Sequence, residues 1–118
     1  MVKILVVDDE EPIRTLFAMA LEEEKHEVID AGNGIEALQL YEQCHPDIII
    51  TDMHMPQMSG IDLIKNIRSK DQFVKIISIS SLVHQEADKE KLIAVGANYC
   101  LAKPVSLDEL IEVVKSCQ

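Results

Sequence analysis

Short runs of apolar residues alternate along the chain with longer segments in which apolar residues recur every three or four positions. We interpret the short runs as β-strands at residues 3–7, 27–31, 47–52, 75–79 and 99–102. The periodic segments predict helices at about 12–21, 35–44, 60–69, 86–95 and from 107 to near the end of the chain. This alternation predicts an α/β fold, a doubly wound five-stranded parallel sheet with right-handed crossovers and helices on both faces.

The third run has three consecutive isoleucines and ends at Asp52. A continuous apolar run is typical of a strand that is buried on both faces, as in parallel sheets covered by helices. In open α/β sheets the chemistry gathers outside the carboxyl ends of the strands, and Asp52 would stand at that edge. Pro56 and Gly60 then shape the exit loop, and Ser59 is a candidate N-cap for the next helix.

The predicted helices are expected to turn their periodic apolar residues toward the sheet. The expected inward residues are Ile13, Leu16, Phe17, Ala20 and Leu21 in the first helix, Gly60, Leu63, Ile64 and Ile67 in the third, Leu92, Ile93 and Val95 in the fourth, and Leu107, Leu110, Ile111 and Val114 in the last. Two helix starts have the form of a capping box, Asn33 with Glu36 and Ser106 with Glu109.

Composition narrows the class of protein. A chain of 118 residues is long enough for one core, so we expect a single domain over residues 1–118. The net charge of −10 argues against binding nucleic acid or an anionic membrane, and no apolar run approaches the roughly 20 residues of a membrane helix. Three cysteines without paired spacing and the lack of a leader pattern predict a reduced, cytoplasmic protein.

Polar residues follow four of the predicted strands. Asp8 and Asp9 follow the first, Asp52 ends the third, Ser80 follows the fourth and Lys103 follows the fifth. These ends become neighbours if the first strand lies between the second and the third. Two unit charges about 4 Å apart repel by roughly 4 kcal/mol at an effective dielectric constant near 20, so three clustered carboxylates require a cation or raised pKa values. Mg²⁺, which prefers oxygen ligands, is the expected cation.

A carboxylate beside Mg²⁺ and a lysine can also receive a phosphoryl group, because this transfer depends mainly on positioning and on neutralising charge. Asp52 would be the nucleophile. Ser80 offers a hydroxyl to one phosphoryl oxygen, Lys103 offers an ammonium group to another, and the metal takes the third. The four histidines lack zinc-ligand spacing and are interpreted as surface residues.

Together, these residues resemble a response-regulator receiver domain, similar to those of bacterial chemotaxis. The resemblance rests on Asp8-Asp9, on Asp52 with Met-Pro at +3 and +4 and Gly at +8, on Ser80, and on Lys103-Pro104, and it runs from Met1 to Ser116. It implies a flavodoxin-like sandwich with strand order 2-1-3-4-5. It also implies that Asp52 is the phosphoacceptor, that Asp8, Asp9, Asp52 and the backbone carbonyl of His54 bind Mg²⁺, and that Lys103 contacts the phosphoryl group.

The resemblance further implies a phosphorylation-dependent switch of a two-component system rather than an enzyme, with self-catalysed phosphoryl transfer and slow autodephosphorylation only. The donor would be a sensor histidine kinase or a phosphotransfer protein. The changed surface, formed by the fourth helix, the fifth strand and the fifth helix, would be read by a downstream protein. No nucleic acid and no membrane are expected to bind this domain.

Three positions depart from the usual pattern of the family. Gly96 lies sixteen residues after Ser80, one more than is usual, which predicts an insertion before the fourth helix and leaves Ser81 as an alternative switch hydroxyl. Cys100 stands where an aromatic residue or histidine is usual, and Val105 stands where phenylalanine is usual. In the family, the aromatic side chain at this position rotates on phosphorylation and changes the surface that partners read. A cysteine side chain is too small to do this, so we expect the conformational change to be carried by the lengthened loop and the fourth helix.

Three rival functions fit the sequence less well. A Mg²⁺-dependent aspartyl-phosphate phosphatase of the haloacid-dehalogenase type requires a second aspartate two residues after the nucleophile, where this chain has His54. A flavodoxin-like cofactor binder would bind a flavin phosphate after the first strand, where residues 8–11 are all acidic and would repel it. A degenerate, purely structural receiver is disfavoured because no motif residue is missing.

Overall fold

Strands and helices alternate strictly in the computed structural model, which describes residues 1–55, 57–80 and 86–118. The elements are β1 (Lys3–Val7), α1 (Glu11–Glu23), β2 (Glu27–Ala31), α2 (Gly34–Cys44), β3 (Ile48–Asp52), α3 (Gly60–Arg68), β4 (Lys75–Ser80), α4 (Glu86–Val95), β5 (Tyr99–Ala102) and α5 (Leu107–Ser116). The predicted elements are confirmed, with Ser80 included in β4 as its last residue.

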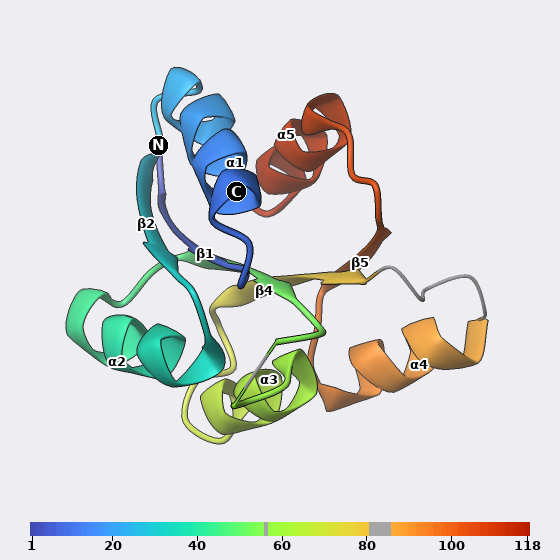
Figure 1. Cartoon of the computed structure of the whole chain (residues 1–118). Helices are drawn as coiled ribbons and strands as arrows, with labels where there is room; N and C mark the ends of the chain where they lie inside the picture. The colour runs from blue at the N-terminus through green and yellow to red at the C-terminus, as the bar shows by residue number, and fades with distance from the viewer. Residues whose placement is uncertain (56, 81–85) are drawn as a thin grey trace.

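The strands form one parallel sheet in the order β2-β1-β3-β4-β5, as predicted (Figure 1). Helices α1 and α5 cover one face of this sheet, and α2, α3 and α4 cover the other (Figure 1). Each face has its own cluster of buried apolar side chains. None of the helices in the described part of the chain is both long and apolar enough to cross a membrane.

Strand β3 lies between β1 and β4, and every one of its residues is buried. Ile49 packs into the cluster beneath α2, α3 and α4, whereas Ile48 and Ile50 pack into the cluster beneath α1 and α5. Alternation along a strand sends successive side chains to opposite faces, so a run that is apolar throughout fills both layers. The prediction that this strand is buried on both faces is confirmed.

Side-chain caps start three of the helices. The Asn33 side chain accepts a hydrogen bond from the Glu36 N–H at 2.8 Å, and the Ser106 hydroxyl accepts one from the Glu109 N–H at 3.0 Å. The Ser59 hydroxyl accepts the Asp62 N–H at 3.2 Å. These bonds satisfy amide groups that have no partner within the helix, and they place the starts of α2, α3 and α5 where the sequence predicts them.

Three of the predicted inward residues do not pack into either core cluster. Leu16 on α1 is 47 % exposed and Ile93 on α4 is 50 % exposed, and Ile111 on α5 lies outside both core clusters. On α1, α4 and α5 the apolar stripe that contacts the sheet is therefore narrower than the sequence predicted, whereas all four predicted inward residues of α3 are buried. Val113 of α5 and Cys117, the residue after this helix, pack against the core, whereas Ile111 does not.

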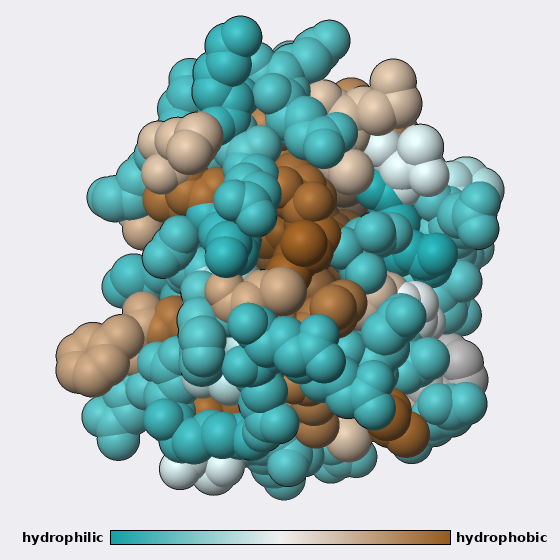
Figure 2. Space-filling model, turned by 90° about the vertical axis from the view of Figure 1, so that its left-hand side faces the viewer, coloured by the Kyte–Doolittle hydropathy of each residue, from teal (hydrophilic) through white to brown (hydrophobic). Residues whose placement is uncertain are grey.

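Strand β2 is one of the two edge strands of the sheet. Seen from this side, apolar atoms are exposed near the centre of the molecule and are surrounded by hydrophilic atoms (Figure 2). Glu27 and Asp30 of β2 are exposed. Charged side chains on an edge strand disfavour pairing with another strand, so these two acids protect the open edge.

Candidate functional site

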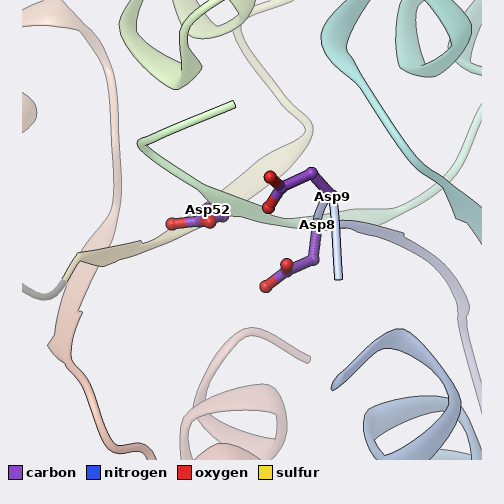
Figure 3. Close-up of side chains that lie close together, drawn as sticks. All are labelled: Asp8, Asp9 and Asp52. Atoms are coloured by element: carbon purple, nitrogen blue, oxygen red, sulfur yellow. The ribbon is translucent and has the colours of Figure 1, made fainter. Parts of the chain in front are cut away.

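Three aspartates meet at the carboxyl ends of β1 and β3. The side chains of Asp8, Asp9 and Asp52 extend into the same space (Figure 3), and each has an oxygen within 4.8 Å of an oxygen of the others. Asp8 and Asp52 are buried, whereas Asp9 is exposed. The structure therefore brings together the three carboxylates that the sequence proposed as metal ligands.

Sheet register explains why the aspartates meet. Val7 of β1 lies opposite Thr51 of β3 in a parallel ladder, so the next residues, Asp8 and Asp52, lie side by side at the edge of the sheet. The Asp8 N–H donates to the Ala31 carbonyl of β2 at 3.1 Å, which continues the β1–β2 ladder by one bond. Apolar strands thus carry two carboxylates to one point at the topological switch of the sheet.

Lys103 supplies the opposing charge. Its Nζ lies 3.2 Å from Asp52 Oδ2 and 3.9 Å from Asp8 Oδ2. Burial acts to lower the pKa of Lys103, but the neighbouring carboxylates of Asp52 and Asp8 outweigh it and raise that pKa. The ammonium group is therefore charged at neutral pH.

One lysine does not balance three carboxylates. The pKa of Asp8 is raised, mainly by burial and further by Asp52 and Asp9, although the Glu10 N–H and Lys103 act to lower it. The Glu10 N–H donates to Asp8 Oδ1 at 2.9 Å. The expectation of a cation or of raised pKa values in this cluster agrees with this shift. An all-oxygen donor set of this kind fits Mg²⁺.

Ser80 ends β4, directly after Ile79, which pairs with Asp52 of β3, and it is 4 % exposed. It pairs with Ala102 of β5, and its carbonyl accepts the Lys103 N–H at 3.0 Å. This backbone hydrogen bond at the end of the β4–β5 ladder therefore holds Ser80 and Lys103 next to each other. The alternative hydroxyl, Ser81, lies outside the described residues.

The chain after Asp52 turns back sharply toward the start of α3. The His54 N–H lies 3.4 Å from Asp52 Oδ1, and the Gly60 N–H donates to the Met53 carbonyl at 3.1 Å. A Cβ on Gly60 would lie 2.6 Å from the Asp52 carbonyl oxygen, so only glycine permits this close approach. Pro56, the other predicted loop-shaping residue, lies outside the described residues.

Tyr99 and Cys100 of β5 face opposite sides of the sheet, as strand alternation predicts. Tyr99 packs with the cluster under α1 and α5, and Cys100 packs with the cluster under α2, α3 and α4. The aromatic ring is therefore on the other face from the position where the family usually has one.

Two features near the site were not found from the sequence. Arg14 of α1 donates from Nη1 to the Asp8 carbonyl at 2.7 Å, and nothing in its spacing singles it out. A cavity of about 520 Å³ opens beside Lys103 between the start of α1 and the segment after β5. Its lining residues are Glu10, Ile13, Leu16, Phe17, Ile79, Lys103, Pro104 and Val105. The position of Leu16 could have indicated this cavity, because an apolar residue at the side of the apolar face of a helix can line a surface pocket.

Comparisons with known proteins agree with this geometry. The family model described as response regulator receiver domain matches residues 4–115. The chain is 33 % identical to the chemotaxis protein CheY of Listeria monocytogenes over 116 residues, which cover 98 % of this chain and 97 % of that protein. It is 34 % identical to the regulatory protein AtoC of Escherichia coli over 96 % of this chain, and there it spans only 24 % of the relative's length.

Among solved structures, the response regulator TrrA of Thermotoga maritima, in complex with Mg²⁺-BeF, is 38 % identical, with a TM-score of 0.89 and full coverage of both chains. The chain therefore belongs to the response regulator receiver domains of two-component signalling. Acceptance of a phosphoryl group is the general function of that family, and histidine kinases or phosphotransfer proteins are its usual donors.

Proposed function

We propose that this protein is a phosphorylation-dependent switch in which Asp52 accepts a phosphoryl group with the help of Mg²⁺. The observation that carries the proposal is the position of Asp52, whose carboxylate lies 3.2 Å from Lys103 Nζ and shares a ligand-sized space with Asp8 and Asp9. A nucleophile flanked by a fixed cation and by metal ligands is what phosphoryl transfer requires.

In the proposed transfer, an oxygen of Asp52 forms a bond to phosphorus while the bond between phosphorus and the imidazole nitrogen of the donor breaks. The electron pair stays on that nitrogen, which then takes up a proton. Lys103 neutralises charge on one phosphoryl oxygen and Ser80 donates its hydroxyl to another. Bound Mg²⁺, held by Asp8, Asp9, Asp52 and the backbone carbonyl of His54, would neutralise charge on the third.

The same residues favour a switch over a hydrolase. Rapid hydrolysis of an aspartyl phosphate needs a group that activates water, and the rival phosphatase class places a carboxylate two residues after the nucleophile. His54 occupies that position and its side chain is exposed. We propose slow autodephosphorylation and no other enzymatic activity.

The donor is proposed to approach over the cavity beside Lys103. Lys103 Nζ lies 3.2 Å from Asp52 Oδ2 and Lys103 also lines this cavity, so a donor surface that covers the cavity would lie beside the phosphoacceptor. Apolar side chains make up most of that lining, with Ile13, Leu16 and Phe17 contributed by α1. We propose that an apolar side chain of the donor protein fills this cavity and aligns the phosphohistidine.

The output surface is proposed to be the face of α4, β5 and α5, read by a downstream protein. Cys100 packs against the core cluster on the α4 side of the sheet. Its small side chain makes apolar contacts there and has no large polar or aromatic group that could move to the surface. The expected carrier of the change, the loop from Ser80 to about Glu86, falls mostly on residues 81–85, outside the described residues.

The deciding experiment uses a small phosphodonor such as acetyl phosphate with Mg²⁺ and intact-mass spectrometry. One acid-labile phosphoryl group is expected on the wild type and none on Asp52→Asn. Asp62→Asn, which changes an exposed aspartate on α3, is the matched control and should be phosphorylated like the wild type. Undiminished phosphorylation of Asp52→Asn, or acid-stable phosphate on serine or threonine, would overturn the assignment.

A further inference from the structure

Arg14 links three elements at the edge of the acidic site. Its guanidinium donates from Nη1 to the Asp8 carbonyl at 2.7 Å and from Nε to Asp30 Oδ2 of β2 at 2.9 Å. The Arg14 side chain is 16 % exposed, whereas that of Asp30 is 51 % exposed. A largely enclosed arginine that uses two donors in different directions has a fixed orientation, because its fork is planar and rigid.

These contacts fix the backbone at Asp8 from both sides. The Asp8 N–H donates to the Ala31 carbonyl at 3.1 Å, and the Asp8 carbonyl accepts from Arg14. Ala31 is the neighbour of Asp30, so β2 holds the amide of Asp8 directly and its carbonyl through Arg14. The plane of the peptide that joins Asp8 to Asp9 is therefore set by α1 and β2 together.

Asp9 depends on that peptide for its direction. Its side chain is exposed, and among the described residues it accepts no hydrogen bond and forms no ion pair, yet its carboxylate points into the space that Asp8 and Asp52 share (Figure 3). With no side-chain partner to hold it, the carboxylate of Asp9 relies on its backbone to set the direction in which the side chain leaves the chain.

We infer that Arg14 is a positioning residue for the metal ligands: it holds the Asp8–Asp9 peptide so that the Asp9 carboxylate meets those of Asp8 and Asp52 around Mg²⁺. This inference rests on the proposed function of the acidic cluster as a Mg²⁺ site. Residues that orient metal ligands without touching the metal typically change metal affinity by ten- to a hundredfold when they are removed. A merely structural arginine would change stability and leave metal affinity alone.

The test is calorimetric titration of the folded protein with Mg²⁺ alone. Arg14→Met keeps the aliphatic length of the side chain and removes every donor, and it should weaken Mg²⁺ binding about tenfold. Arg14→Lys keeps the charge and can reach only one partner, so its Kd should lie between those of Arg14→Met and the wild type.

Arg68→Met is the matched control. Arg68 also donates to backbone carbonyls, those of Gly96 at 2.9 Å and Asp71 at 3.1 Å, but it lies at the end of α3, away from the acidic cluster. This variant should lose thermal stability and bind Mg²⁺ with the wild-type Kd. An equal loss of affinity in both arginine variants would overturn the inference.

The outcomes separate this inference from the function on which it rests. If the wild type binds Mg²⁺, Asp9→Asn weakens binding and Arg14→Met does not, the metal site stands and the role of Arg14 is refuted. If the wild type does not bind Mg²⁺, both are refuted. Should Arg14→Met fail to fold, Asp30→Ala on the exposed edge strand decides: we expect Mg²⁺ binding about threefold weaker, and an unchanged Kd would refute the inference.

Discussion

Aspartates at the two ends of the sheet have pKa values shifted in opposite directions. At the end where strands begin, Asp71 accepts hydrogen bonds from the Tyr41 hydroxyl at 2.7 Å and from the N–H groups of Phe73 at 2.8 Å and Val74 at 3.1 Å. Burial acts to raise the pKa of Asp71, but these donors outweigh it and lower that pKa. At the end where strands finish, the pKa of Asp8 is raised by burial and by nearby carboxylates.

The aspartate at the start of the strands stabilises the fold, whereas those at the end of the strands are arranged to bind a cation. Donors surround Asp71, so ionisation of this aspartate favours the folded state. Asp8 and its neighbours have fewer donors than acceptor oxygens. Two unit charges 4.8 Å apart repel by roughly 0.9 kcal/mol at a dielectric constant of 80 and by about 3.5 kcal/mol at 20. The excess negative charge at this end of the sheet favours binding of a cation. Without a cation, repulsion between the carboxylates lowers the stability of the folded protein.

The largest effect is expected from breaking the stabilised end. Asp71→Ala leaves the Tyr41 hydroxyl and two N–H groups without their acceptor, so the free energy of unfolding should fall by about 3 kcal/mol. Chemical denaturation at neutral pH measures it. Asp47→Ala, which removes one bond from the Lys3 N–H at 2.9 Å, should cost about 1 kcal/mol. Equal losses in the two variants would contradict the role assigned to the donors of Asp71.

Removing a charge at the other end should have the opposite sign. Without metal, Asp9→Asn should be as stable as the wild type or more stable, by up to a few kcal/mol, because repulsion falls and no hydrogen bond is lost. With Mg²⁺, the wild type should gain stability and the variant should gain much less. Thermal melts with and without Mg²⁺ test both halves, with Glu11→Gln as a nearby acid control. Undiminished Mg²⁺ stabilisation of Asp9→Asn would refute the site.

The pH dependence sharpens the comparison further. The pKa of Asp71 lies below its ordinary value of 3.8, so its stabilisation is present above that value and lost as pH falls through the folded-state pKa. The pKa of Asp8 lies above 3.8, so its ionisation destabilises the fold as pH rises through the folded-state pKa.

Metal-free melts between about pH 3 and pH 7 test these signs. The Tm advantage of Asp8→Asn over the wild type should grow as pH rises, and the Tm deficit of Asp71→Asn should shrink as pH falls. Two variants whose differences from the wild type changed with pH in the same direction would show that the two ends do not differ as described.

The smallest effect on stability is expected from Leu16→Glu at the strand-end cavity. Because Leu16 is 47 % exposed, stability should change by less than about 0.5 kcal/mol. Phosphotransfer from a protein donor should slow about tenfold, the equivalent of roughly 1.4 kcal/mol, while labelling by acetyl phosphate stays unchanged. Met19→Glu, also exposed on α1 but outside the cavity lining, is the control. An equal effect on both phosphodonors would refute the proposed docking contact.

Local patterns predicted most of the fold because each element carries its own signals. The three isoleucines before Asp52 indicate a doubly buried strand, and the caps at Asn33, Ser59 and Ser106 mark helix starts. The site followed from one topological rule, since polar residues that end neighbouring parallel strands meet at one edge. The strand order itself came from the family resemblance.

Features that depend on distant contacts escaped prediction. Periodicity gives the apolar face of a helix but not the width of the stripe that the sheet covers, which is why Leu16, Ile93 and Ile111 were wrongly assigned to the core. Arg14 escaped for a related reason. Its partners, Asp8 just after β1 and Asp30 on β2, lie six and sixteen residues away, and no local pattern encodes that pairing.

The burial of β3 on both faces also determines how rarely this strand opens. Its backbone is bonded to β1 on one side and to β4 on the other, and both of its faces are covered. Segments of this kind exchange their amide hydrogens only when the whole domain opens, whereas loops and chain ends open far more often. A phosphoryl group on Asp52 would therefore be attached to the slowest-opening part of the molecule. The lifetime of the signal would be set by hydrolysis and by partner proteins, not by local unfolding around the phosphorylated residue.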